Sequence, residues 1–178
     1  MNRLQGFLAH DPGNLSLLED AASAAYEEGA LDLAAELLDR YVTISPLTPV
    51  LINLQGLVAL GRNRLIDAVE IFERLHNDDK DTSALRFNLA WCYALLGSHK
   101  EALDLLDCET LAISHRAPAL KIEMMHHLGL YEDALTCGGE LAERFPNDQA
   151  LMGALATLAM DAEQPDLAYH YARKDRKS

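Results

Sequence analysis

The 178-residue sequence has few cysteines, few basic side chains and no long apolar run. Each scarcity argues against a class of protein. Three cysteines are too few, and odd in number, for the disulfide framework of a small secreted domain. Lys and Arg number 15 against 28 Asp and Glu, and the net charge of −13 disfavours nucleic-acid binding and anionic membrane surfaces. No apolar stretch approaches the roughly 20 residues that span a bilayer, so no membrane partner is expected.

The compartment follows from similar absences. Residues 1–12 contain only a short apolar stretch with no small-residue cleavage site after it, unlike a secretory signal. The three cysteines, Cys92, Cys108 and Cys137, are expected to be reduced thiols in the core or half-buried. The sequence therefore predicts a cytoplasmic protein. Its length predicts one domain, and its 49% hydrophobic content argues against disorder.

Alanine recurs along the chain at a nearly constant spacing. The spacings between successive members of the set are 34, 34, 32 and 34 residues. A turn signal rich in Gly or polar residues precedes each alanine, and the flanking segments place apolar residues at helical intervals. A period of this length indicates stacked helix hairpins, which bury their apolar faces only against neighbouring hairpins. The members of the set are Ala34, Ala68, Ala102, Ala134 and Ala168.

This pattern resembles the tetratricopeptide repeat (TPR), a pair of antiparallel helices with small and large residues at fixed positions. The third unit fits best, with Asn88-Leu89-Ala90, Tyr93, Gly97, Ala102 and Leu106 at matching positions. The second unit keeps Gly56, Ala68 and Phe72. The fourth is degenerate in its first half, where Lys121 and Ile122 replace the usual Leu and Gly.

The repeat predicts an all-α fold: a right-handed α-solenoid of about five antiparallel helix hairpins. Residues 1–12 are expected to form a lone capping helix, and the repeat domain is expected to occupy residues 15–178. Four basic residues near the end, from Arg173 onward, are interpreted as a solvated tail rather than a docking site. The expected repeats are residues 15–48, 49–82, 83–114, 115–148 and 149–178.

The fourth repeat is expected to be the softest or most distorted. Pro118 is tolerated only in a first helical turn, so this helix should begin near Ala117. Gly138 and Gly139 lie inside the next helix, where each glycine costs about 1 kcal/mol relative to alanine. The pair is interpreted as drift in a degenerate repeat, with a hinge or a close helix contact as the alternative.

No arrangement of residues suggests catalysis. The sequence lacks a G-x-S-x-G elbow, a glycine-rich phosphate loop and an H-E-x-x-H metal motif. The string from Glu123 to His127 contains one Glu-x-x-His, whereas di-iron bundles use that motif twice. It is interpreted as an exposed polar stripe. The sequence thus predicts a non-enzymatic protein with no metal and no cofactor.

The resemblance implies a concave groove lined by the first helices of the hairpins, which in TPR proteins commonly receives a peptide or helix. Its middle is apolar and aromatic, which predicts an apolar peptide or helix as the partner. A clamp for an acidic peptide tail would need more basic residues than the near candidates Asn53, Arg86 and Asn88 provide. The groove residues expected to bind the partner are Tyr26, Asn53, Leu57, Leu60, Phe87, Trp91, Glu123 and His126.

Trp91 is the centre of this hypothesis. It lies off the apolar packing set of Leu89, Ala90, Tyr93 and Leu96, and Leu57 is expected beside it from the preceding repeat. Three functions remain open: an adaptor or chaperone that binds its partner in the groove, a homodimer that buries the apolar stripe, and a chaperone similar to those of type III secretion.

Overall fold

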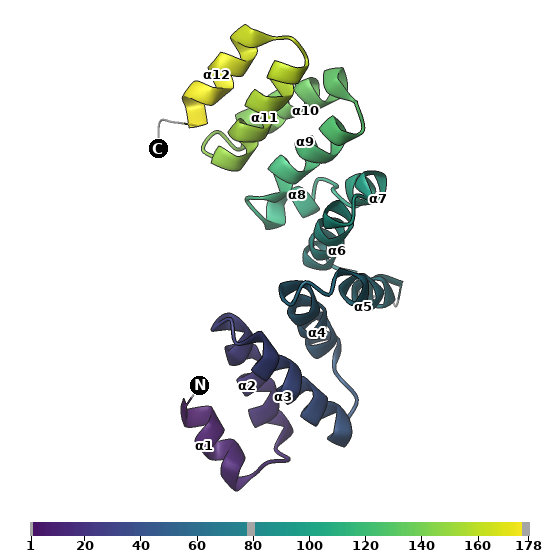
Figure 1. Cartoon of the computed structure of the whole chain (residues 1–178), viewed down its shortest axis with the longest axis vertical. Coiled ribbons are helices and arrows are strands. Elements are labelled where there is room, and N and C mark those ends of the chain that lie inside the picture. Colours follow the sequence, from purple (N-terminus) through teal and green to yellow (C-terminus); the bar gives the residue numbers. More distant parts are fainter. Residues whose placement is uncertain (1, 78–80, 176–178) are drawn as a thin grey trace. The chain divides into compact units, whose positions relative to one another are not determined.

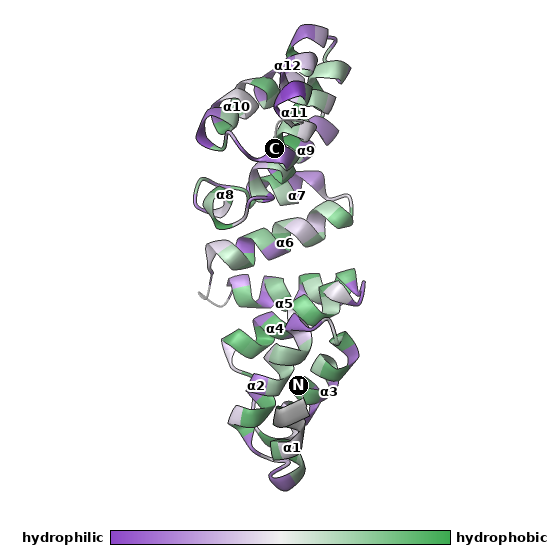
Figure 2. Cartoon of the chain, turned by 90° about the vertical axis from the view of Figure 1, so that its left-hand side faces the viewer, coloured by the Kyte–Doolittle hydropathy of each residue, from purple (hydrophilic) through white to green (hydrophobic). Residues whose placement is uncertain are grey.

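The computed structural model describes residues 2–77 and 81–175, and within these ranges every regular element is a helix (Figure 1). The chain divides into two compact units, Met1–Asp81 and Thr82–Ser178, each described by itself below. The helices carry both hydrophobic and hydrophilic residues, as expected of helices that bury one side only (Figure 2). The all-α class predicted from the sequence is confirmed.

The N-terminal unit is built from two helix hairpins and one additional helix. The two hairpins are α2 with α3 and α4 with α5, and α1 packs against α2. Leu8 of α1 is buried in the same core as Leu18 of α2. The bounds are α1 Asn2–His10, α2 Leu15–Glu27, α3 Leu31–Ile44, α4 Pro49–Gly61 and α5 Leu65–Asn77.

The C-terminal unit contains three hairpins, the first of which is irregular. Helix α6 pairs with the short α7, and the four-residue α8 packs against α6 and α9. Helix α9 then pairs with α10, α11 pairs with α12, and α9 also packs against α11. The bounds are α6 Ser83–Leu95, α7 His99–Asp104, α8 Thr110–Ile113, α9 Ala117–His127, α10 Tyr131–Arg144, α11 Gln149–Asp161 and α12 Pro165–Asp175.

One turn geometry joins the helices of all five hairpins. In each turn a backbone N–H donates to the carbonyl five residues earlier, at 2.8–3.0 Å, and the residue just before that donor has a positive φ. This is the Schellman arrangement, which favours glycine at the positive-φ position. The positive-φ residues are Gly29, Asn63, Gly97, Gly129 and Glu163, and they repeat with the same spacings as the alanines.

The first helices of four hairpins begin with the same side-chain cap. A polar oxygen accepts the backbone N–H three residues later, which satisfies one of the free donors at the helix start. The caps are Asn14 to Leu17, Thr48 to Leu51, Thr82 to Leu85 and Asp148 to Leu151. Helix α9 has no such side-chain cap: Arg116 precedes it and donates its backbone N–H to Ser114 Oγ at 3.2 Å, and the helix begins at Ala117 with Pro118 in its first turn, as predicted.

The five repeat alanines all lie in the core, with exposures of 0–3%. Close approach of two helices requires small residues where they meet. In the second hairpin, for example, Gly56 on α4 lies against the Phe72 ring on α5. A Cβ added to Gly56 would overlap with the Phe72 ring. The apolar core of the N-terminal unit centres on Leu18, Leu38 and Leu51, and the core of the C-terminal unit contains Leu106.

The expectation that the fourth repeat is the most distorted is wrong. Helices α9 and α10 have 11 and 14 residues, whereas in the third repeat α7 ends after six. Gly138 is buried, and a Cβ on it would overlap with the Leu155 side chain, so it marks a close helix contact rather than drift. Gly139 has open space beside it.

Three smaller expectations also need correction or restriction. Leu96, placed in the packing set of α6, is 44% exposed because it lies at the C-terminal end of that helix. Cys108 is exposed rather than buried, because it lies in the turn after α7, while Cys92 is buried and Cys137 half-buried. The last three residues of the expected basic tail, 176–178, lie outside the described residues.

Candidate functional site

The predicted groove residues are divided between the two units, and none of them is fully buried. Tyr26, on α2, is half-buried and packs against the N-terminal core. Asn53, Leu57 and Leu60 lie at i, i+4 and i+7 on α4, which places them on one side of that helix, and all three are half-buried. Leu57 and Trp91 belong to different units, so the expectation that they lie side by side stays a prediction.

In the C-terminal unit the aromatic part of the site consists of Phe87 and Trp91 on α6. Their ring centroids are 6.2 Å apart and their planes are tilted by 38°. Both side chains are half-buried and pack against the C-terminal core. The prediction that Trp91 lies off the apolar packing set is therefore wrong in part, because the side chain packs against the core and stays only partly accessible.

Arg116 covers part of Trp91. Its guanidinium carbon is 4.5 Å from the ring centroid, within the range of a cation–π interaction. Arg116 immediately precedes α9, so the start of α9 positions this cation over α6. The 32-residue spacing appears here as a shorter first helix: α9 has 11 residues, whereas α2, α4, α6 and α11 each have 13.

Glu123 and His126 lie further along α9. Partial desolvation raises the pKa of Glu123, while the neighbouring charges of His127 and Arg116 act to lower it. His126 Nε2 is 2.9 Å from Asp161 Oδ2 on α11, and its ring is 5.6 Å from that of Tyr131. His126, the histidine of the lone Glu-x-x-His, is thus engaged with side chains from α10 and α11.

A row of histidines extends from this point. The rings of His127 and His99 are stacked with centroids 4.4 Å apart, and His126 lies 6.0 Å from His127. His99 Nδ1 is buried and has no hydrogen-bond partner. In the described part of the chain, no group of three or more His, Cys, Asp or Glu side chains is arranged to hold a metal ion.

Arg86, a near candidate for an acidic-peptide clamp, is engaged within the protein. Its guanidinium lies 2.9 Å from Glu109 Oε2 and 3.4 Å from Asp107 Oδ2. Its Nε donates to the hydroxyl of Thr110, which is fully buried. Only 16% of the side chain is exposed. Sequence reasoning missed this network because it joins residues more than 20 positions apart.

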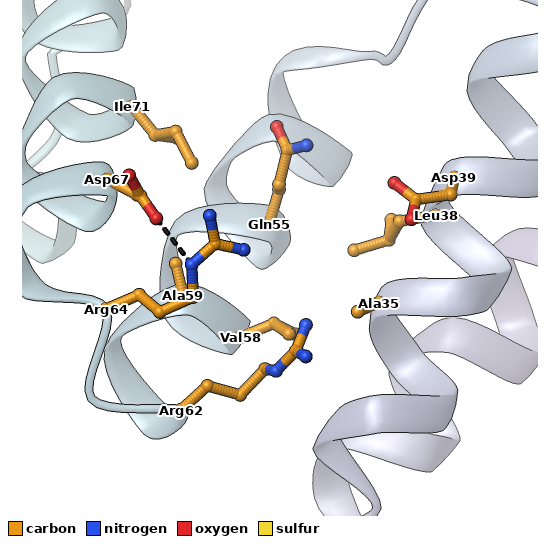
Figure 3. Close-up of a pocket in the computed structure, with 10 residues that line it drawn as sticks. All are labelled: Ala35, Leu38, Asp39, Gln55, Val58, Ala59, Arg62, Arg64, Asp67 and Ile71. Carbon is orange, nitrogen blue, oxygen red and sulfur yellow. Dashed lines mark ion pairs between the residues drawn. The ribbon is translucent and has the colours of Figure 1, made fainter.

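A cleft of about 170 Å³ between α3, α4 and α5 was also not foreseen (Figure 3). Arg64 forms an ion pair with Asp67 at one side of it, and Arg62 pairs with Asp32 at 3.1 Å. Asp39 lies on α3, across the cleft from these arginines (Figure 3). None of its lining residues belongs to the predicted groove set. They are Ala35, Leu38, Asp39, Gln55, Val58, Ala59, Arg62, Arg64, Asp67 and Ile71.

The cysteines differ in their surroundings. Burial raises the pKa of the Cys92 thiol to about 11, so this thiol stays protonated near neutral pH. Burial also raises the pKa of Cys137, with Lys121 opposing the shift. Among the helices described here, none has the length and apolar character needed to cross a bilayer.

Comparison with solved structures identifies proteins of similar fold. MamA residues 41 to the end, from Desulfovibrio magneticus RS-1, align with a TM-score of 0.80 at 13% identity, covering 92% of this chain and 97% of that one. A further MamA crystal structure gives 0.75 at 14% identity, covering 90% and 89%. Identities this low establish a shared fold only. No curated protein matches the sequence.

Comparison with sequence families agrees with the fold. Tetratricopeptide repeat families match residues 2–49 and residues 50–108. The two matches are contiguous and together cover more than half of the chain. The buried alanines and the repeated turns extend the same register through α12. The chain belongs to the tetratricopeptide repeat family.

Proposed function

We propose that this protein is a cytoplasmic adaptor or chaperone that binds an apolar peptide or helix. Membership of the TPR family supports a protein–protein interaction or scaffold role. The observation that carries the finer proposal is the half-buried pair of Phe87 and Trp91 on α6, with Arg116 over the Trp91 ring. Residues of this type dominate binding energy in protein interfaces, where Trp and Arg are the most enriched anchors.

The arrangement favours an apolar ligand over an acidic one. Binding is favourable when a partner's apolar side chains displace water from the accessible surface of Phe87 and Trp91. Arg86, the cation closest to them on α6, is already paired with Asp107 and Glu109. Arg116 is exposed and stacks on Trp91, so one cation lies beside the aromatic surface. Glu123, an exposed acidic residue, lies further along α9. A peptide with leucine or phenylalanine anchors and few acidic residues matches this surface.

The proposal is tested by selecting binders from a random peptide library displayed on phage. We expect enrichment of sequences with two or more large apolar residues. Because Trp91 is the only tryptophan, its fluorescence reports binding at this site directly, and bound peptides should shift its emission to shorter wavelength. Phe87→Ala should weaken the selected peptides by at least about tenfold, since the truncated residue is an interface anchor.

The matched control is Phe7→Ala, which removes a 49% exposed phenylalanine from α1 in the other unit and should leave binding unchanged. Equal binding of the selected peptides to the wild type and to the Phe87→Ala and Trp91→Ala variants would refute the site. Enrichment of acidic peptides would refute the proposed ligand chemistry.

A further inference from the structure

The outer face of the hairpin formed by α11 and α12 is an apolar surface, and among the described helices α12 contacts α11 alone. Within it lies an open concavity of about 460 Å³ between α11 and α12. Two large side chains on this face are strongly exposed, Met160 at 61% and Tyr169 at 69%. The residues that line the concavity are Ala156, Thr157, Met160, Pro165, Ala168, Tyr169 and Ala172, which we call the end face.

The equivalent surface of the preceding hairpin shows what packs on a surface of this kind. Ala156 and Ala172 occupy the positions that Ile122 and Gly138 occupy one repeat earlier, 34 residues before. In that earlier hairpin, α11 covers the equivalent surface, and Leu155 packs against Gly138 and Ile122. The end face therefore has the form of a helix-binding surface.

The charges on α12 indicate the direction of the helix that fits. Asp166 lies in the first turn of α12, and Arg173 and Lys174 lie in its last turn. Asp166 and Arg173 are exposed and seven residues apart, so both project from the same side of the helix. Tyr169 lies near the midpoint between them. If a second helix with the same sequence lay antiparallel to α12, its first-turn acidic residue would face the last-turn basic residues of α12, and the reverse.

We propose that the end face binds a second copy of this chain, in a symmetric dimer with the two α12 helices antiparallel. Asp166 of each copy then faces Arg173 of the other, and the two Tyr169 side chains meet near the two-fold axis. The stripe of Pro165, Tyr169 and Ala172, at i, i+4 and i+7, forms the apolar centre, with Met160 beside it. Two-fold symmetry is the commonest form of self-association and requires such a self-complementary surface.

The other end of the chain is a poorer match for this surface. Helix α1 has no acidic residue in its first turn and only His10 as a basic residue in its last turn. A head-to-tail contact between α1 and the end face would leave Arg173 and Lys174 without an acidic partner from α1. The charge pattern thus selects the tail-to-tail arrangement.

The contact is expected to be weak. Helix α12 has 11 residues and a length of about 16 Å, so the paired hairpins bury an area at the small end of specific interfaces. A dimer that dissociates in the micromolar range is expected. It differs from self-association through the groove stripe because Phe87 and Trp91 take no part in it.

Charge reversal tests the arrangement by sedimentation velocity over about two decades of protein concentration. The wild type should pass from monomer to dimer as concentration rises. Asp166→Lys and Arg173→Glu should each weaken the dimer at least tenfold, because each places like charges opposite one another. The double variant should restore dimerisation. Both single changes oppose the dipole of α12, so rescue by the double variant cannot come from a more stable helix.

Tyr169→Glu should abolish the dimer, since it places two negative charges together at the axis. The control is Ile66→Glu, which changes a 67% exposed apolar residue on α5 in the other unit and should leave dimerisation unchanged. A wild type that stays monomeric at every concentration overturns the proposal. A dimer that survives Tyr169→Glu, or a double charge reversal that fails to restore association, overturns it equally.

Discussion

The third and fourth hairpins of this protein depart from the TPR pattern in opposite ways. The third hairpin has the sequence closest to the pattern, yet its second helix, α7, ends at Asp104 after six residues. The fourth is degenerate in the first half of its sequence, yet α9 and α10 are both continuous, with 11 and 14 residues. Agreement with the consensus positions therefore predicts the register of a repeat better than it predicts the continuity of its helices.

Side-chain hydrogen bonds hold the segment between α7 and α8, where the third hairpin is broken. The Asp107 carboxylate accepts the backbone N–H of Thr110 at 2.8 Å, an alternative to continuing the helix. Arg86 then holds Asp107, Glu109 and Thr110 from α6, and Lys121 Nζ donates to the Leu106 carbonyl at 2.9 Å. Leu106 and Leu111 remain buried on either side of the turn. Side-chain contacts thus replace the missing helical turns.

The fourth hairpin contains a glycine that looks unfavourable in sequence. Gly138 lowers the helix propensity of α10, but its missing side chain admits Leu155 from α11. Packing between neighbouring hairpins outweighs the local propensity, because tertiary burial supplies most of the stability of helices this short.

The largest expected effect comes from filling this contact. Gly138→Val should lower the free energy of unfolding by about 2–3 kcal/mol, because the new side chain overlaps with the buried Leu155. Gly139→Ala is the matched control: its Cβ meets open space, and the substitution should raise stability by about 0.5–1 kcal/mol. Urea denaturation measures both. Equal effects of the two substitutions would contradict the close contact.

Next in size is the loss of the polar network in the third hairpin. Arg86→Ala should cost about 1–2 kcal/mol, because it removes hydrogen bonds to charged partners from a largely buried side chain. Hydrogen exchange should become faster in α8 before the rest of the C-terminal unit. Lys100→Ala, which removes an exposed pair with Asp104, should change stability by less than about 0.5 kcal/mol. Uniform exchange throughout the unit would count against a local role.

Substitutions in the turns of the third and fourth hairpins should change stability by similar amounts. Gly97 and Gly129 both have positive φ, 79° and 74°, so Gly97→Ala and Gly129→Ala should each cost about 1 kcal/mol. Glu163 has a φ of 58° at the equivalent place, and Glu163→Gly should therefore stabilise the protein by up to about 1 kcal/mol. Thermal unfolding measures all three. A loss of stability in the Glu163→Gly variant would mean that the side chain contributes more than its backbone strain costs.

The smallest expected effect is a pH dependence of stability caused by Asp107, which lies between α7 and α8. The hydrogen bond from the Thr110 backbone N–H is the main cause of the lowered pKa of Asp107, and Arg86 acts in the same direction. A lowered pKa in the folded state stabilises the fold above the ordinary value of 3.8, and this contribution is lost as pH falls through the lower folded value. The Thr110 amide resonance should report the titration in acid. In Asp107→Asn that titration should be absent; its persistence would assign the transition to another carboxylate.

The sequence alone determined the register of this protein. Residues that repeat every 32–34 positions predicted the stacked hairpins and the all-α class, and Pro118 predicted the start of α9 near Ala117. Such features are readable because helix period, turn geometry and close helix contacts each restrict residue type locally.

The tertiary structure decided what depends on distant contacts. Trp91 packs against the core and beneath Arg116, and Arg86 pairs with Asp107 and Glu109, so both side chains meet residues more than 20 positions along the chain. The role of Gly138 became visible only with Leu155 beside it. A repeat fixes which face of a helix turns inward, whereas the partner of each side chain is fixed by how neighbouring hairpins pack, and the local sequence does not encode that packing.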